Sequence, residues 1–180
     1  LAALLQFSPG ACEAGLKALQ GGALILTDTA MAAAAVRPMV ARTAGNEVRC
    51  LLDWAPARSP QGSTRSAAAM VRAWPELIQA ANNAGKPLPL VLIGSAPTAL
   101  EQLLDQLDAG AQAPSLVIGM PVGFVGVPES KRRLAQTTLD QIRLDGTRGG
   151  AGLVAAAVNA LLRQVAVPNG VNVEAQQEVP

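Results

Sequence analysis

The 180 residues contain no histidine, no tyrosine, two phenylalanines and two cysteines. Without histidine, these residues cannot form a serine–histidine or cysteine–histidine nucleophilic pair. Cys12 and Cys50 stand far apart with no metal ligands at short spacing, so no zinc site is expected, and nothing in the sequence favours a disulfide. No apolar run approaches the ~20 residues that a membrane-spanning helix requires. We therefore expect a cytoplasmic protein without a membrane partner.

Apolar residues are abundant and make up 50% of the chain, whereas aromatic residues make up 2%. The core must therefore be built from Ala, Leu, Val and Ile, a composition that favours helices packed closely on a sheet. The 14 basic and 13 acidic residues are mixed along the chain and give a net charge of +1. Nucleic-acid binding normally requires a basic face, often with aromatic side chains, so no nucleic-acid partner is expected.

Short β-rich runs alternate with longer helical segments, which indicates an α/β fold with a mostly parallel sheet. We expect one doubly wound domain at 1–164, with helices on both faces, and a disordered tail at 165–180. Pro75 should kink or split the longest helix. The expected strands are 23–27, 48–54, 88–93, 116–119 and 141–144. The expected helices are 8–20, 30–42, 63–84, 97–107, 128–135 and 151–163.

Ligands of open α/β sheets bind beyond the carboxyl ends of the strands, so the residues that follow each expected strand are the candidates. After the first strand, Asp28 is more often a helix cap than an acid. Before the long helix, Arg65 stands among small hydroxyl residues. Such a helix N-terminus favours an anion, although simple capping with a solvated Arg explains the same residues. Arg148, followed by two glycines, places another cation at a helix start.

Two further strands end in glycine-containing segments, GSAPTAL at 94–100 and GMPVGFVGVPESK at 119–131. The glycines of the second segment match neither the dinucleotide-binding pattern nor the P-loop, which argues against a nucleotide-binding protein. An apolar, glycine-rich loop that contains Phe124 suits contact with a large apolar ligand. The strand ends together predict a wide pocket for a mostly apolar ligand with several carboxylates. They identify no reaction.

Six segments resemble, in order, the successive blocks of the precorrin-8X methylmutase family: ILTDTAM, GN, STRSAA, GSAPTAL, GMPVGFVGVPESK and RGGAG. FSPGACEAGLKAL near the start also fits, and the resemblance covers residues 1–162. It implies a flavodoxin-like fold, a homodimer with active sites near the interface, and no cofactor. The reaction it implies is an isomerisation, in which a methyl group migrates within ring C of precorrin-8X to give hydrogenobyrinate. The substrate, a tetrapyrrole, is either metal-free or already carries cobalt.

The resemblance also implies which residues contact the substrate. Arg65 is the preferred carboxylate partner, because a guanidinium holds a carboxylate through two parallel hydrogen bonds. The loops after the third and fourth strands line the macrocycle. The implied set is Thr27, Asp28, Met31, Thr64, Arg65, Ser66, Pro97, Thr98, Met120, Val122, Gly123 and Phe124.

The family's acid is a histidine just upstream of the block that begins here with LAALLQF, so its position precedes Leu1. We therefore expect a longer natural gene product and name no catalytic residue in this chain. Asp28 or Glu129 could replace the histidine only with a pKa raised by burial. The alternative to an isomerase is a non-catalytic corrinoid-binding protein or an inactive truncated copy.

Overall fold

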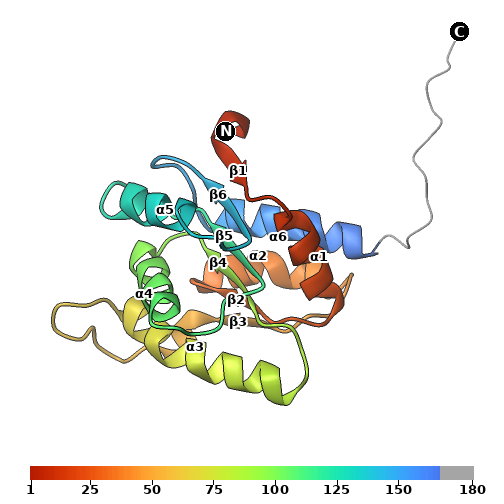
Figure 1. Ribbon diagram of the computed structural model, residues 1–180, viewed down its shortest axis with the longest axis horizontal. Helices are drawn as coiled ribbons and strands as arrows, with labels where there is room; N and C mark the ends of the chain where they lie inside the picture. Colours follow the sequence, from red (N-terminus) through yellow and green to blue (C-terminus); the bar gives the residue numbers. More distant parts are fainter. Residues whose placement is uncertain (167–180) are drawn as a thin grey trace, which may run out of the picture.

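Six strands form one sheet with helices on both faces (Figure 1). The structure is a computed structural model that describes residues 1–166. The strand order is β1-β6-β5-β4-β2-β3, and every neighbouring pair is parallel except β1 with β6. From β3, the parallel strands follow the flavodoxin-like order, which confirms the predicted fold class. The strands are Leu5–Phe7 (β1), Ile25–Thr27 (β2), Val48–Cys50 (β3), Leu90–Ile93 (β4), Leu116–Gly119 (β5) and Gln141–Leu144 (β6).

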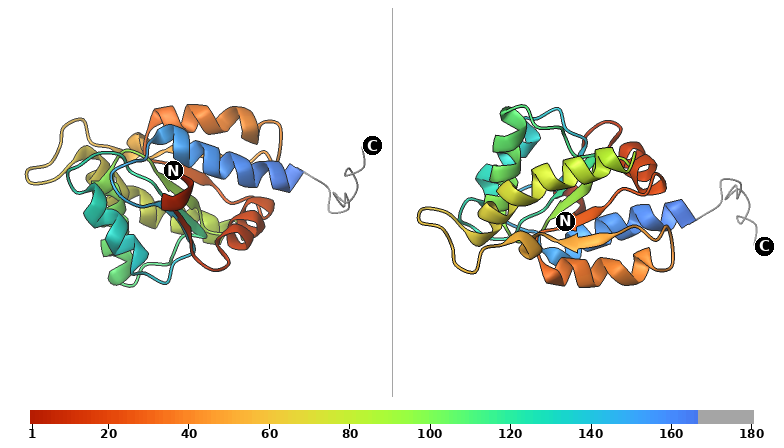
Figure 2. Two further views of the ribbon diagram at one scale, coloured as in Figure 1. Left: turned by 90° about the horizontal axis from the view of Figure 1, so that it is seen from above. Right: turned by 90° about the horizontal axis from the view of Figure 1, so that it is seen from below.

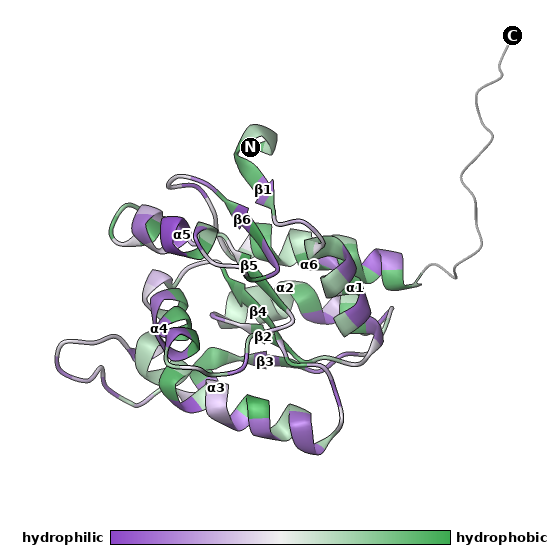
Figure 3. Ribbon diagram, in the orientation of Figure 1, coloured by the Kyte–Doolittle hydropathy of each residue, from purple (hydrophilic) through white to green (hydrophobic). Residues whose placement is uncertain are grey.

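Side chains alternate along each strand, so each face of the sheet has its own apolar core. On one face, Ile25, Leu92 and Ile118 pack against α1, α2 and α6. On the other, Leu26 and Val91 pack against α3, α4 and α5. Figure 2 shows the resulting layers. Figure 3 shows apolar strands between helices, of which α3, α4 and α5 carry polar residues on their outer sides while α2 and α6 are mostly apolar. The helices are Ala11–Gln20 (α1), Ala30–Val40 (α2), Arg65–Asn83 (α3), Pro97–Asp108 (α4), Val127–Ala135 (α5) and Ala151–Ala166 (α6).

The first residues differ from the sequence prediction, which placed a helix start at Ser8 and no strand before it. The antiparallel strand β1 instead pairs with β6. Ser8 continues this pairing, since its N–H donates to Gln141 O and its Oγ accepts the Gln141 N–H, both at 2.9 Å. Gly10, with φ of 82°, is the N-cap of α1. The left-handed backbone at Gly10 delays the helix to Ala11.

Two more predicted elements have different limits. β3 ends at Cys50, and a 3-10 turn over Leu51–Trp54 replaces the rest of the predicted strand. α3 begins at Arg65 with Thr64 as its N-cap, and it continues unbroken through Pro75. The prediction that Pro75 splits this helix is wrong. Pro75 is exposed, as is Val71 one turn earlier, so the carbonyl that loses its N–H donor lies on the solvent side.

The last helix, α6, continues to Ala166 and so includes the first two residues of the predicted tail. Val165 still packs against the core on the α1–α2 side. The remainder of the predicted tail, 167–180, lies outside the described residues. No helix within residues 1–166 combines the length and the apolar character needed to cross a membrane.

Asn46 holds the turn between α2 and β3 against the rest of the domain. Its side chain is 6% exposed, and Nδ2 donates to Leu19 O at 3.0 Å and to Ala23 O at 2.9 Å. These carbonyls belong to the end of α1 and the chain entering β2. One amide thus joins three segments that meet at the amino ends of β2 and β3.

Replacing Asn46 with Asp should remove both donors and place a carboxylate against two carbonyl oxygens. We expect the free energy of unfolding to fall by about 2 kcal/mol or more at pH 7, because buried unpaired polar groups are costly. Urea denaturation followed by circular dichroism measures this change. Asn83→Asp, at an exposed position at the end of α3, is the matched control and should change stability by less than about 0.5 kcal/mol. Equal losses in both variants would contradict the assigned role.

Candidate functional site

The candidate site lies at the carboxyl ends of the parallel strands, on the left in Figure 1. The strand order reverses between β2 and β4, and this switch point is where open α/β sheets bind ligands. The loops that follow β2, β4, β5 and β6 meet here, together with the N-termini of α3 and α4. Every block of the sequence resemblance except GN and the N-terminal segment contributes residues to this edge.

Asp28, the residue after β2, binds the end of β4. Its Oδ2 accepts the N–H groups of Gly94, Ser95 and Ala96 at 3.0, 2.6 and 2.8 Å. Three consecutive amides pointing at one oxygen form an anion-binding nest, here occupied by a side chain of the same protein. The alternative of a cap for α2 does not apply, because Thr29 accepts the Ala32 N–H and fills that role.

Asp28 is also the buried one of the two candidate acids. Its side chain is 1% exposed, and burial raises the pKa of this carboxyl, while the three N–H donors partly offset the shift. Its Oδ1 is buried without a hydrogen-bond partner among residues 1–166. Glu129 is exposed and forms an ion pair with Arg132 at 3.0 Å. Of the two, only Asp28 has the burial that a retained proton requires.

The N-termini of α3 and α4 meet through a pair of hydroxyl groups. Thr64 Oγ1 lies 2.7 Å from Thr98 Oγ1, and it also accepts the Ala67 N–H as the cap of α3. Arg65 is exposed, and its Nε donates to Pro56 O at 2.8 Å, which turns the side chain toward the 55–62 loop. The N-termini of α3 and α4 and the guanidinium of Arg65 therefore all lie at the carboxyl edge of the sheet.

The β5–α5 loop is apolar and strongly exposed at its tip. Phe124 is 85% exposed and Val125 is 91% exposed, while Val122 is about half exposed. Gly123 and Gly126 have positive φ values of 130° and 70°, a conformation that other residues rarely adopt. The loop thus turns apolar side chains outward into solvent at the edge of the sheet.

The loops after β4, β5 and β6 are packed backbone to backbone. A Cβ on Gly94 would lie 2.7 to 2.9 Å from backbone atoms of Gly150 and Ala151. A Cβ on Gly149 would overlap the carbonyl of Met120. Hydrogen bonds reinforce these contacts, since Gly150 N–H donates to Met120 O at 2.9 Å. Glycine is needed in these loops because three main chains approach more closely than side chains allow.

Lys131 of α5 is buried beneath the β6–α6 loop. It is 2% exposed, and its Nζ donates to Gly146 O at 2.9 Å and to Arg148 O at 2.6 Å. Burial lowers the pKa of the Lys131 ammonium to about 8, while the charge of Asp145 acts in the opposite direction. The sequence prediction did not include Lys131. Its place in the family-like segment at 119–131, which ends in ESK, was the feature of the sequence that could have indicated a role for this lysine.

The predicted substrate-contact residues divide into two groups. Nine lie at the surface of the carboxyl edge or close to it: Met31, Thr64, Arg65, Ser66, Pro97, Thr98, Val122, Gly123 and Phe124. Thr27, Asp28 and Met120 are buried, with exposures of 0%, 1% and 2%. Met120 belongs to the core on the α1–α2 side of the sheet. There it lines an apolar hollow of about 190 Å³, together with Leu1 and Leu144. Thr27 and Asp28 hold the loops instead, since Thr27 Oγ1 donates to Thr29 O and Asp28 accepts the N–H groups at the end of β4.

The fold and the edge define a flavodoxin-like α/β protein with glycine-packed strand-end loops and no phosphate-binding loop among its described residues. A family model for precorrin-8X methylmutase matches residues 1–164. The chain belongs to this family, whose members are isomerases of corrin biosynthesis. This confirms the resemblance inferred from the sequence blocks.

Individual relatives agree with the family match. A precorrin-8X methylmutase of Pseudomonas aeruginosa is 46% identical over 162 residues, which cover 87% of this chain and 73% of the relative. A cobalt-precorrin-8 methylmutase of Synechocystis is 37% identical over 148 residues, covering 82% and 64%. The solved structure of a precorrin-8X methylmutase from Thermus thermophilus superposes with a TM-score of 0.76 at 43% identity. That match covers 91% of this chain and 77% of the Thermus chain.

Gly94→Ala should destabilise the protein, because the added Cβ meets backbone atoms that cannot move aside. We expect a loss of about 1 to 3 kcal/mol in the free energy of unfolding, as for other overpacked sites. Gly152→Ala is the matched control, since its Cβ meets nothing within 4 Å and it lies in α6. That change should stabilise the helix by about 0.5 to 1 kcal/mol. Thermal melts of both variants measure the difference, and equal shifts would contradict the packing described.

The lowered pKa of Lys131 predicts a specific dependence of stability on pH. Between about pH 8 and the unperturbed value of 10.5, the unfolded chain binds more protons at this residue than the folded one. The contribution of Lys131 to the free energy of unfolding therefore rises with pH in this window. Lys131→Met removes that rise. The free energy of unfolding of the wild type minus that of the variant should therefore increase from pH 8 to pH 10. Urea melts at pH 7, 8.5 and 10 test this, and a constant difference would refute it.

Proposed function

We propose that the carboxyl edge of the sheet binds the corrin-ring substrate of a methylmutase reaction, precorrin-8X or its cobalt form. In that reaction a methyl group migrates within the ring, and the protein's task is to hold the macrocycle in one orientation. The observation that carries the proposal is that the family-matching blocks converge on one edge although they are dispersed along the chain. Family membership supplies the ligand class, and the edge supplies groups that suit it.

The proposed contacts follow from the chemistry of each loop. The apolar tip of the β5–α5 loop, with Val122 and Phe124, suits the face of a macrocycle. The acetate and propionate groups at the rim of a corrin ring require cations and N–H donors. Arg65 and the N-termini of α3 and α4 offer these, with Ser66, Pro97 and Thr98 at the same helix starts. Met31, in the first turn of α2, extends the apolar surface on the β2 side.

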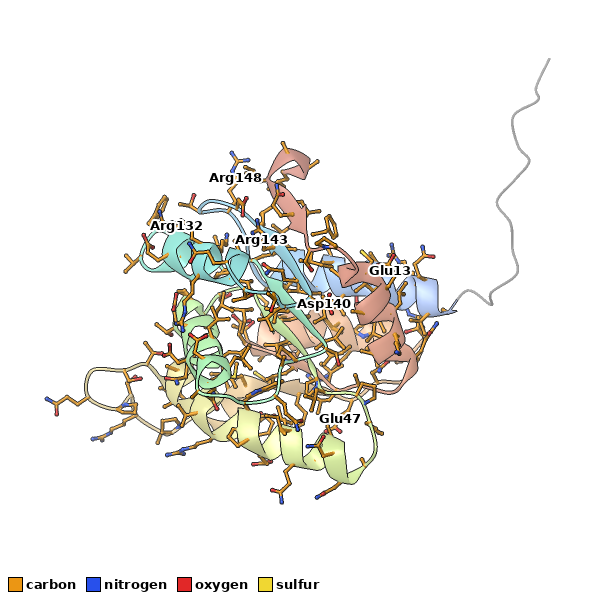
Figure 4. All side chains as sticks on the ribbon, in the orientation of Figure 1. Glu13, Glu47, Arg132, Asp140, Arg143 and Arg148 are labelled. Carbon is orange, nitrogen blue, oxygen red and sulfur yellow. The ribbon has the colours of Figure 1, made fainter. Side chains whose placement is uncertain are left out.

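Two exposed arginines at this edge offer contacts to the carboxylates of a ligand. Arg65 and Arg148 lie at the carboxyl edge. Asp140 and Glu47 directly precede β6 and β3 and therefore lie at the opposite edge, as Figure 4 shows for the labelled side chains. Lys86 and Lys17 lie beside these two acids, and Glu129 and Asp145 lie at the carboxyl edge. Arg65 and Arg148 are therefore offered as individual carboxylate contacts rather than as a field of one sign. The predicted homodimer, cytoplasmic location and absence of a cofactor remain predictions.

Titration with hydrogenobyrinate, followed by absorbance, tests the proposal. We expect the wild-type chain to bind and Arg65→Ala to bind about tenfold more weakly, since a hydrogen bond to a charged group contributes ~1.5 kcal/mol or more. Arg72→Ala is the matched control, because Arg72 is exposed on the same helix two turns from its N-terminus. Its affinity should equal that of wild type.

Two results would count against the proposal. A folded wild-type chain that shows no absorbance change would exclude hydrogenobyrinate binding by this edge alone. Equal weakening by Arg65→Ala and Arg72→Ala would show a general effect of charge rather than a contact at the start of α3. Circular dichroism of each variant establishes that it is folded before the titration.

A further inference from the structure

Lys131 differs from the other lysines of the chain. Lys17 and Lys86 are exposed, whereas Lys131 is 2% exposed and forms no ion pair among residues 1–166. Burying an ammonium without a partner is strongly unfavourable. Its partners are two backbone carbonyls of the β6–α6 loop, Gly146 O and Arg148 O. The side chain therefore remains buried only while this loop keeps its conformation.

The segment held by Lys131 in turn holds the β5–α5 loop. Gly123 N–H donates to Thr147 O at 3.0 Å, so the residue between the two bound carbonyls is itself an acceptor. On the other side of Arg148, Gly150 N–H donates to Met120 O. Lys131 lies in α5, after the β5–α5 loop, so its bonds and these two backbone bonds together join both ends of that loop to the β6–α6 loop.

Arg148 is the residue whose position this arrangement determines. Its carbonyl accepts the shortest bond of Lys131, while its side chain is exposed and forms no ion pair within residues 1–166. Of the two glycines that follow, Gly149 is packed against the backbone of Met120 and Gly150 N–H donates to Met120 O, so the chain is held on that side as well. Figure 4 shows the Arg148 side chain directed outward from the β6–α6 loop. A fixed backbone beneath a free guanidinium is the arrangement expected of a preorganised anion contact.

We propose that Lys131 is a positioning residue: its ammonium holds the β6–α6 loop so that Arg148 meets a ligand carboxylate at the carboxyl edge. This inference rests on the proposed function, because Arg148 would contact the same corrin ligand. Lys131 touches no ligand and acts through Arg148 and the two joined loops. Removing the ammonium should therefore weaken ligand binding without removing any ligand contact.

A double-mutant cycle in ligand binding tests this role. Wild type, Lys131→Met, Arg148→Ala and the double variant are titrated with hydrogenobyrinate at one pH and salt concentration. We expect each single variant to bind about tenfold more weakly, and the double variant to bind no more weakly than the weaker single variant. Losses that multiply in the double variant would show that Lys131 acts independently of Arg148, which would overturn the proposal. Lys17→Met is the matched control and should bind as wild type does.

Amide hydrogen exchange in the free chain separates this inference from the proposed function. Lys131→Met should speed exchange at Gly123 and Gly150 relative to the strands, and this readout needs no ligand. If wild type does not bind, the proposed function fails while the exchange data still decide whether Lys131 orders the loops. If wild type and Lys131→Met bind equally well, the positioning role alone is excluded. If Lys131→Met does not fold, Lys131→Gln, which keeps a donor, replaces it, and a smaller loss of affinity is expected.

Discussion

Three consecutive amides at the end of β4 converge on one carboxylate oxygen at the end of β2. Asp28 thus joins the two strands between which the chain reverses its direction across the sheet. The bond to Gly94 is central, because Gly94 also accepts the Val122 N–H at 3.2 Å and packs against the start of α6. The loops after β4, β5 and β6 are therefore arranged around a contact made by the loop after β2.

This interaction also explains why a carboxylate is placed there despite its burial. Oδ2 of Asp28 accepts hydrogen bonds from three loop N–H groups that would otherwise have no acceptor. Oδ1 has no partner among the described residues. The loss of water around the carboxyl therefore outweighs the three donors, and burial raises its pKa. Such incomplete satisfaction at a switch point is typical of a site whose geometry serves a ligand rather than maximal stability.

The sequence predicted the central strands well, because β2, β4 and β5 are buried on both faces and therefore appear as continuous apolar runs. It failed where pairing depends on distant residues. β1 has only three residues, and its partner strand lies more than 130 residues later in the sequence. No local pattern therefore predicts it. That the candidate residues gather at the strand ends was predictable from the geometry of parallel sheets. The partners of Asp28 and Lys131 were not, because they are backbone groups of loops brought together only by the complete fold.

The pairing of β1 with β6 has a consequence for how the protein is made. β1 is translated before the other strands of the sheet, yet its partner within residues 1–166, β6, is the last of them. Until β6 emerges, β1 has no strand with which to pair, and Leu5 cannot take its place against the core on the α1–α2 side. Long-range pairing of this kind is slow and leaves an unpaired edge open to other chains. The sheet is therefore completed when β1 pairs with β6, and the interval before that step is when a nascent chain is most prone to associate with a neighbour.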